Sequence, residues 1–189
     1  NIFEMNDNDS DDESFSFYVI GRNPKLMRAE LKNIEDGEFF VHLGDIFSAK
    51  NQDCDGKAYD TAADLLRKAH LPVLVIPGDE DWIDCRNVKP KEALSLWRNS
   101  FVDIEKNWKG NSNLPGLVQR SEDYPENFAF VFRGTLFIGI GNVGDDDDED
   151  ESKMREKKTK TFIKRPIKTF ESDPSLRSVI VISHAYDFN

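Results

Sequence analysis

No stretch of this sequence is apolar enough to cross a membrane, because a transmembrane helix needs roughly 18 or more consecutive apolar residues. The chain also begins without a Met, a basic leader or the short apolar run of a signal peptide. A signal peptide that has been removed and an incomplete start are both compatible with this. We therefore expect no transmembrane segment among these residues.

Basic residues are too few to give the chain a dominant positive surface. Asp and Glu number 36 against 25 Lys and Arg, and the formal net charge is -11. Thirteen of the acids lie within residues 1–14 and 145–151, so the other 23 nearly balance the basic residues. Non-specific nucleic-acid binding requires a basic face, so we expect no nucleic-acid partner. Residues 1–14 are polar and acidic, which is typical of a disordered segment.

Cysteine is scarce, with only Cys54 and Cys85 in 189 residues. Two buried thiols are the usual arrangement in an intracellular protein. One disulfide between two loops would instead indicate an oxidising compartment. The number of cysteines leaves both interpretations open.

Short apolar runs alternate with helical patterns in the first half of the chain. Three runs predict strands at 14–20, 38–43 and 72–76, and a glycine follows each within two positions. Apolar positions at helical spacing predict helices at 25–34, 58–69 and 90–101, the last beginning with Pro90. Continuous apolar strands between helices are typical of a parallel sheet covered on both faces. We therefore expect an α/β domain with functional loops at the carboxyl ends of the strands.

The pattern changes in the second half. Runs at 128–132 and 136–140 flank Arg133-Gly134-Thr135 and predict a β-hairpin. An acidic run and a basic segment follow, at about 145–170, and read as an insertion whose charges neutralise each other. A last strand is expected at 178–183, with His184 at its end. Because the chain stops just after this strand, we expect that a C-terminal part is missing.

Three strand-end blocks carry residues suited to metal chemistry. They are FFVHLGDI at 39–46, VIPGDEDW at 75–82 and VIVISHA at 179–185. In this order they resemble the Gly-Asp, Gly-Asn-His-Asp/Glu and later histidine blocks of the calcineurin-like metallophosphoesterases. That family hydrolyses phosphoesters with two metal ions held by carboxylates and imidazoles. The resemblance implies a four-layer αββα sandwich over residues 15–189, with Asp45, Asp79 and His184 as metal ligands.

One uncharacterised branch of the family is similar over more of the chain. Its Gly-Asp-Asn-Glu-Trp-Thr-Asp-Cys block resembles GDEDWIDC at 78–85. Its Gln-containing segment leading into Tyr-Pro-Glu-Asn resembles QRSEDYPEN at 119–127, and its Asn-Val-Val-Gly-like turn resembles NVG at 142–144. The resemblance therefore extends from about residue 15 to residue 184.

The chain departs from the family at residues that matter for catalysis. Arg22 stands where the family has the first metal-binding aspartate, and a guanidinium has no lone pair to give a cation. Glu80 replaces the histidine that assists the leaving group, and it could donate a proton only with a raised pKa. The closing Gly-His-x-His block is not among these residues.

Two arrangements of the remaining site residues are open. Asp45, Asp79 and His184 could hold one divalent ion, such as Mn, Fe, Zn or Mg, with water completing its shell. Alternatively, Arg22 could pair with both carboxylates and replace the metal, leaving no cofactor. His42 is expected to pack or hydrogen-bond locally, Trp82 to pack its loop against the core, and Glu126 to act as a loop acceptor.

The two cysteines follow neighbouring strand ends, which makes a Cys54–Cys85 disulfide geometrically reasonable. Similar sequences of the branch also carry cysteines at these two places. We expect this disulfide and, with it, a secreted or lumenal setting. For function we expect a catalytically degenerate metallophosphoesterase domain that binds a protein partner or builds an assembly. The alternative is a phosphoester hydrolase with one metal, in which Arg22 clamps the phosphate.

Overall fold

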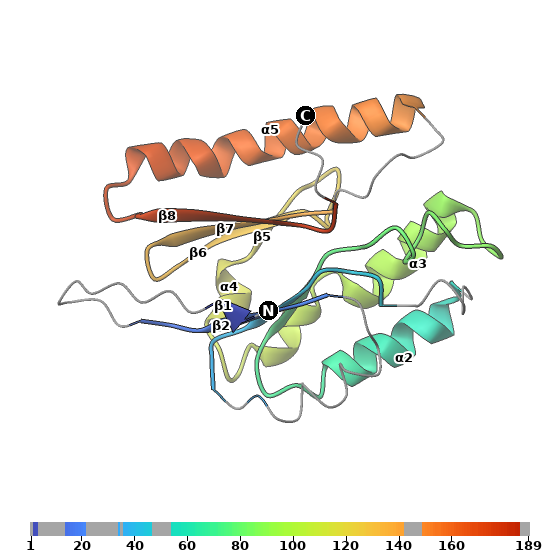
Figure 1. The fold of residues 1–189 in the computed structure, drawn as a ribbon, viewed down its shortest axis with the longest axis horizontal. Helices are drawn as coiled ribbons and strands as arrows, with labels where there is room; N and C mark the ends of the chain where they lie inside the picture. The colour runs from blue at the N-terminus through green and yellow to red at the C-terminus, as the bar shows by residue number, and fades with distance from the viewer. Residues whose placement is uncertain are drawn as a thin grey trace.

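A computed structural model describes residues 2–3, 14–21, 34, 36–46, 54–141 and 149–185. The described residues form an α/β structure with two four-stranded sheets and helices between the strands (Figure 1). None of the helices in these ranges combines the length and the apolar character that crossing a bilayer requires.

The first sheet has the strand order β1-β2-β3-β4. It contains β1 (Ile2–Phe3), β2 (Phe17–Ile20), β3 (Phe40–His42) and β4 (Val73–Val75). The last three strands are parallel, as the sequence pattern predicted, while β1 pairs antiparallel with β2. Strand β1 lies inside the segment 1–14 that we expected to be disordered, and two backbone-paired residues are too few to be visible in the sequence.

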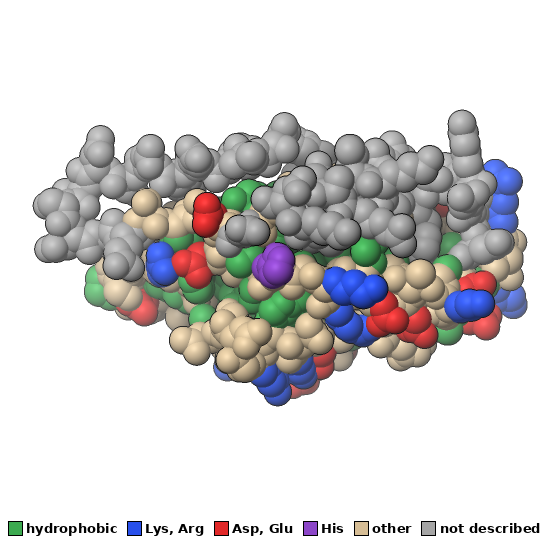
Figure 2. All heavy atoms as spheres, turned by 90° about the horizontal axis from the view of Figure 1, so that it is seen from below, with side chains coloured by type: hydrophobic (Ala, Val, Ile, Leu, Met, Phe, Trp, Pro, Cys, Tyr) green, Lys and Arg blue, Asp and Glu red, His purple; other side chains and the backbone are tan. Residues whose placement is uncertain are grey.

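Helices α2 (Gly56–Leu66) and α3 (Pro90–Phe101) cover one face of this sheet, close to their expected positions. Asp55 caps α2 by accepting a hydrogen bond from the Ala58 N–H at 2.7 Å. Seen from the side of α2 and α3, acidic and basic side chains are interspersed (Figure 2). This agrees with the near balance of charge outside the two acidic runs. The helix expected at 25–34 falls outside the described residues, except for Ile34.

The chain crosses to the second sheet through η1 (Ile104–Trp108) and α4 (Leu114–Leu117). The second sheet has the order β5-β6-β7-β8. It contains β5 (Gln119–Arg120), β6 (Phe128–Phe132), β7 (Thr135–Ile140) and β8 (Ser178–Ser183).

The expected hairpin joins β6 and β7 as an antiparallel pair. Arg133 and Gly134 both have positive φ, of 45° and 77°, at its turn, which suits the right-handed twist of the strands. Strand β8 pairs parallel to β7, so the second sheet is mixed.

The two sheets pack face to face through aromatic side chains. Phe17 and Phe39 of the first sheet meet Phe130 and Phe137 of the second, with Phe39 and Phe137 edge to face at 5.2 Å between ring centroids. Each buried phenylalanine contributes about 1.5–3 kcal/mol of hydrophobic free energy. This aromatic layer joins the sheet that contains β3 and β4 to the sheet that contains β8.

Helix α5 (Glu149–Ser172) covers the outer face of the second sheet. It lies in the segment marked by the sequence as an acidic and basic insertion, for which no helix or strand was predicted. Its apolar side chains Phe162, Ile163, Ile167 and Phe170 pack on the sheet. Because residues 145–170 are rich in charged side chains, their composition alone does not reveal this apolar stripe. The acidic residues 145–148 lie outside the described part of the chain.

The cysteine prediction is confirmed: Cys54 and Cys85 form a disulfide with a Cα–Cα distance of 5.7 Å. The bond ties the segment before α2 to the loop that follows β4. Along the chain, Cys54 comes after Asp45 and Cys85 comes after Asp79.

Candidate metal centre

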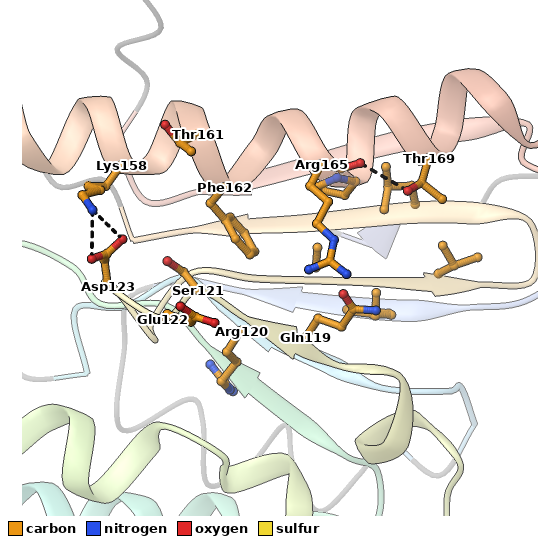
Figure 3. Close-up of a pocket in the computed structure, with 15 residues that line it drawn as sticks. Gln119, Arg120, Ser121, Glu122, Asp123, Lys158, Thr161, Phe162, Arg165 and Thr169 are labelled. Carbon is orange, nitrogen blue, oxygen red and sulfur yellow. Dashed lines mark hydrogen bonds and ion pairs between the residues drawn. The ribbon is translucent and has the colours of Figure 1, made fainter.

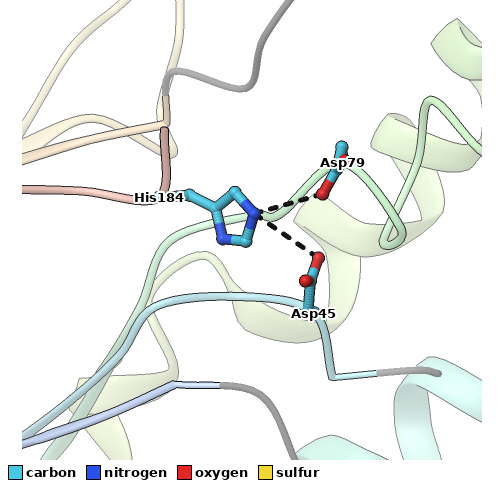
Figure 4. Close-up of side chains that lie close together, drawn as sticks. All are labelled: Asp45, Asp79 and His184. Atoms are coloured by element: carbon cyan, nitrogen blue, oxygen red, sulfur yellow. Dashed lines mark hydrogen bonds and ion pairs between the residues drawn. The ribbon is translucent and has the colours of Figure 1, made fainter. Parts of the chain in front are cut away.

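Three strand-end side chains that the sequence singled out come together in the structure. Asp45 follows β3, Asp79 follows β4 and His184 follows β8, and each offers a ligand atom within 4.8 Å of the others (Figure 4). One end of each strand therefore faces the same point, although Asp79 and His184 are 105 positions apart. Carboxylate oxygens and an imidazole nitrogen are a donor set that suits Zn, Mn or Fe.

The orientation of His184 is set by a backbone carbonyl. Its Nδ1 lies 2.5 Å from the Leu43 oxygen, so this nitrogen carries the proton and donates it. The other nitrogen, Nε2, points between the two carboxylates, 3.1 Å from Asp79 Oδ1 and 3.6 Å from Asp45 Oδ1 (Figure 4). In the neutral ring, the Nε2 lone pair points between the two carboxylates, where a cation could bind to all three side chains. A backbone carbonyl behind a metal-binding histidine is a common supporting contact.

Asp45 is held in an uncommon backbone conformation. Its φ is 54° and that of Gly44 is 84°, so two successive residues turn the chain sharply after β3. Gly44 and Gly78 also approach so closely that a side chain on either would collide with the opposite loop. The strand-end glycines therefore permit the short distance between Asp45 and Asp79.

Asp81 joins the two loops, and sequence reasoning assigned it no role. Its Oδ2 accepts hydrogen bonds from the N–H groups of Asp45 and Gly78, both at 2.9 Å, and its Oδ1 accepts one from Ile46 at 2.8 Å. The side chain is completely buried. A signal was present in the sequence, since Asp81 occupies the fourth position of the Gly-Asp-Glu-Asp block.

Burial acts differently on the two carboxyl groups of the centre. It raises the pKa of Asp45 to about 6, although His184 opposes this shift. For Asp79, burial again favours the protonated form, but hydrogen bonds from Asp45 and from backbone N–H groups lower its pKa overall. Asp45 is 4% exposed and Asp79 is 48% exposed. The centre is thus closed on the Asp45 side and open to solvent on the Asp79 side.

Three further residues had predicted roles at or near the centre: His42, Glu80 and Arg22. His42 is buried and its Nδ1 accepts a hydrogen bond from the Gly44 N–H at 3.1 Å, which agrees with the local role expected for it. Burial lowers the pKa of His42 to about 4, with a further contribution from His184. Glu80 is buried beside the centre, and its backbone N–H lies 3.4 Å from Asp45 Oδ1. Arg22 falls outside the described residues, so its pairing with the carboxylates stays a prediction.

Trp82 connects the loop after β4 to helix α5, and Glu126 connects α3 to α5. Trp82 is 2% exposed, and the guanidinium of Arg155 lies over its ring at 5.0 Å. Glu126 accepts two hydrogen bonds from Arg98, at 2.8 and 2.9 Å, and one from Arg155 at 2.6 Å. Both residues therefore have the packing or loop-holding role that the sequence predicted.

Comparison of the chain with models of protein families, with curated proteins and with solved structures finds no match.

Proposed function

We propose that this chain is a calcineurin-like metallophosphoesterase domain that binds one divalent ion and has lost the family's two-metal catalysis. The observation that carries the proposal is the convergence of Asp45, Asp79 and His184 at the ends of three strands. In the family that the sequence resembles, the corresponding blocks supply metal ligands at those strand ends. The four layers of helix, sheet, sheet and helix agree with the same assignment.

Loss of catalysis follows from the departures in the sequence. Arg22 brings a positive charge to the place of the first metal-binding aspartate. Glu80 takes the place of the histidine that assists the leaving group. The domain has one ion and lacks both the first metal-binding aspartate and the histidine that assists the leaving group. It therefore acts in binding or assembly with a protein partner. The Cys54–Cys85 disulfide supports a secreted or lumenal setting for that partner.

A second function, hydrolysis of a phosphoester at a single metal ion, is favoured by the open side of the centre. Asp79 is about half exposed, so a bound ion would keep positions open to water and to a phosphate group. A divalent ion in such a site activates water and neutralises phosphate charge. In this version Arg22 holds the phosphate.

Metal content tests the proposal directly. The full chain is purified without chelators, reconstituted separately with Mn, Fe, Zn and Mg, and measured by elemental analysis. The variant is Asp45→Asn, because asparagine tolerates the positive φ of this position while it removes the charge. Asp84→Asn is the matched control, since Asp84 is an exposed acid of the neighbouring loop.

We expect about one equivalent of metal in the wild type and in Asp84→Asn, and a large loss in Asp45→Asn. Absence of metal from the wild type under all four conditions would contradict the proposal that the domain binds a divalent ion. Hydrolysis of p-nitrophenyl phosphate and bis(p-nitrophenyl) phosphate is measured on the same samples. Turnover that follows the metal and disappears in Asp45→Asn would establish the hydrolase, whereas a background rate with metal bound supports the degenerate domain.

A further inference from the structure

A cavity of about 420 Å³ lies between helix α5 and the β5–β6 side of the second sheet. It is built from other elements than the candidate metal centre, and its size is within the range of small-molecule sites. Apolar side chains line much of it: Ala129, Val131, Leu136, Phe162 and Pro166.

The charged groups at this cavity are unevenly distributed. At one end Lys158 pairs with Asp123 at 3.1 Å, and Glu122 lies beside them (Figure 3). Arg120 below is held by Glu105 at 2.7 Å. These groups leave that end without excess positive charge.

Arg165 differs from the other cations that line the cavity. It extends from α5 into the space above the strands, toward the end where Gln119 lies (Figure 3). In the described part of the chain, no hydrogen bond or ion pair holds its guanidinium group. A guanidinium presents a planar set of donors that matches a carboxylate or phosphate group. This end of the cavity is therefore suited to an anion.

A second hollow continues from the Arg165 end along the surface of α5. It shares Thr161, Arg165 and Thr169 with the cavity. It adds Lys164 and Lys168, and its one carboxylate, Asp173, already accepts hydrogen bonds from the N–H and hydroxyl of Ser175. Positive charge thus accumulates where the apolar cavity opens.

Pro166 follows Arg165, which lines both the cavity and the second hollow. It lines the cavity and, as an imino acid within α5, has no amide hydrogen to give to the carbonyl of Phe162. A proline inside a helix is unfavourable in isolation, and here its ring contributes apolar surface to the cavity.

We propose that this cavity binds an amphiphilic anion, with a phosphate or carboxylate group at Arg165 and Lys168 and an apolar body between α5 and β6. The apolar lining selects against an inorganic ion alone, because it gains free energy only from burying hydrocarbon. Arg165 selects against an uncharged amphiphile of the same size, because charge-assisted hydrogen bonds are the stronger ones. The ligand is either a free amphiphile or the headgroup and chain of a membrane lipid.

Calorimetric titration of the full chain with octyl phosphate tests this proposal, with octanol and inorganic phosphate as partial ligands. We expect octyl phosphate to bind and each partial ligand to bind at least about tenfold more weakly. Arg165→Gln should weaken octyl phosphate binding by about tenfold or more. Lys157→Gln, which removes the same charge from an exposed position of α5 away from the cavity, should leave it unchanged.

Two further variants examine the apolar part and the other site. Val131→Asp places a negative charge in the cavity and should abolish binding, whereas Val181→Asp changes a similarly exposed valine of β8 and should not. Asp45→Asn should bind octyl phosphate like the wild type, since the metal centre is elsewhere. Equal effects of Arg165→Gln and Lys157→Gln, loss of binding in Asp45→Asn, or no binding by the wild type would each overturn the proposal.

Sedimentation with vesicles identifies the source of the ligand. Phosphatidylcholine vesicles with and without phosphatidic acid are mixed with wild type and Arg165→Gln. Sedimentation that needs phosphatidic acid and Arg165 assigns the site to a membrane lipid. If octyl phosphate binds in the titration but the vesicles do not sediment the protein, the ligand of the site is a free amphiphile.

Discussion

The carboxylate of Asp81 accepts a hydrogen bond from the backbone N–H of Asp45 at 2.9 Å, across 36 positions of the sequence. The same oxygen accepts the Gly78 N–H, so one buried side chain holds the two loops that carry Asp45 and Asp79. The hydroxyl of Tyr59 adds a further contact by donating to the Asp81 carbonyl at 2.6 Å. The geometry of the candidate centre therefore depends on groups that do not belong to it.

Asp81→Asn should lower both stability and metal affinity. The amide group can no longer accept all three backbone N–H bonds, and one buried donor would face another donor. We expect a loss of about 1–3 kcal/mol in the free energy of unfolding, measured in urea. Asp84→Asn, an exposed neighbour, serves as the control and should change little. Equal stability of both variants would show that the Asp81 contacts do not hold the loops.

Gly78→Ala should disrupt the centre by steric collision. A Cβ at this position would meet the Asp45 side chain, lie 2.5 Å from the Asp45 nitrogen and lie 2.8 Å from His184 Cε1. We expect a destabilisation of about 1–3 kcal/mol in thermal or urea unfolding, together with weaker metal binding. At Gly116, in α4, an added Cβ has nothing within 4 Å. Gly116→Ala should therefore be neutral or slightly stabilising, and a similar loss there would contradict the collision argument.

The contribution of Asp45 to stability should decrease as pH rises. Burial raises its folded-state pKa to about 6, so in metal-free protein the folded state holds this proton more tightly than the unfolded state. The stabilisation is complete below the ordinary pKa of an aspartate, about 3.9, and is lost as pH passes 6. We therefore expect the unfolding free energy of the wild type, relative to Asp45→Asn, to fall between pH 4 and 7. The measurement is urea unfolding in EDTA, and a rise across this range would contradict the assigned burial effect.

Removal of the Cys54–Cys85 disulfide should destabilise the fold and loosen the loops of the centre. The bond closes a segment of 31 positions, and such a crosslink is worth about 2–4 kcal/mol through the unfolded state. Guanidinium unfolding of the wild type with and without reductant measures this loss. The double variant Cys54→Ser, Cys85→Ser should unfold like the reduced wild type and should not respond to reductant. A response of the double variant would assign the effect to another cause.

Glu126→Gln should be strongly destabilising, because it leaves Arg98 and Arg155 without their shared counter-charge. Glu126 is fully buried, and although burial opposes its ionisation, the two arginines lower its pKa overall. Breaking such a buried ion pair costs about 3–5 kcal/mol. Asp123→Asn removes an exposed pair with Lys158 and should cost less than about 1 kcal/mol in the same unfolding assay. Comparable losses in both variants would contradict the distinction between buried and exposed pairs.

Local patterns in the sequence were sufficient to locate much of the framework. The run of apolar residues before Gly44, the same arrangement before Gly78 and the run before His184 predicted β3, β4 and β8, and helical spacing predicted α2 and α3. These elements are readable because strand and helix periods are properties of neighbouring residues. The positions of Asp45, Asp79 and His184 at strand ends followed from the same patterns.

Contacts between distant residues decided the rest. Helix α5 is highly charged, and the role of its apolar stripe is visible only in the folded structure. There, Phe162 and Ile163 pack on the second sheet. The role of Asp81 exists only because two loops meet, and the cavity at Arg165 exists only because α5 lies over β5 and β6. The sequence pattern of one element predicts which of its side chains share a face. It does not predict which other element that face will pack against. Packing of the layers supplies that information, and it creates both the candidate metal centre and the cavity beside α5.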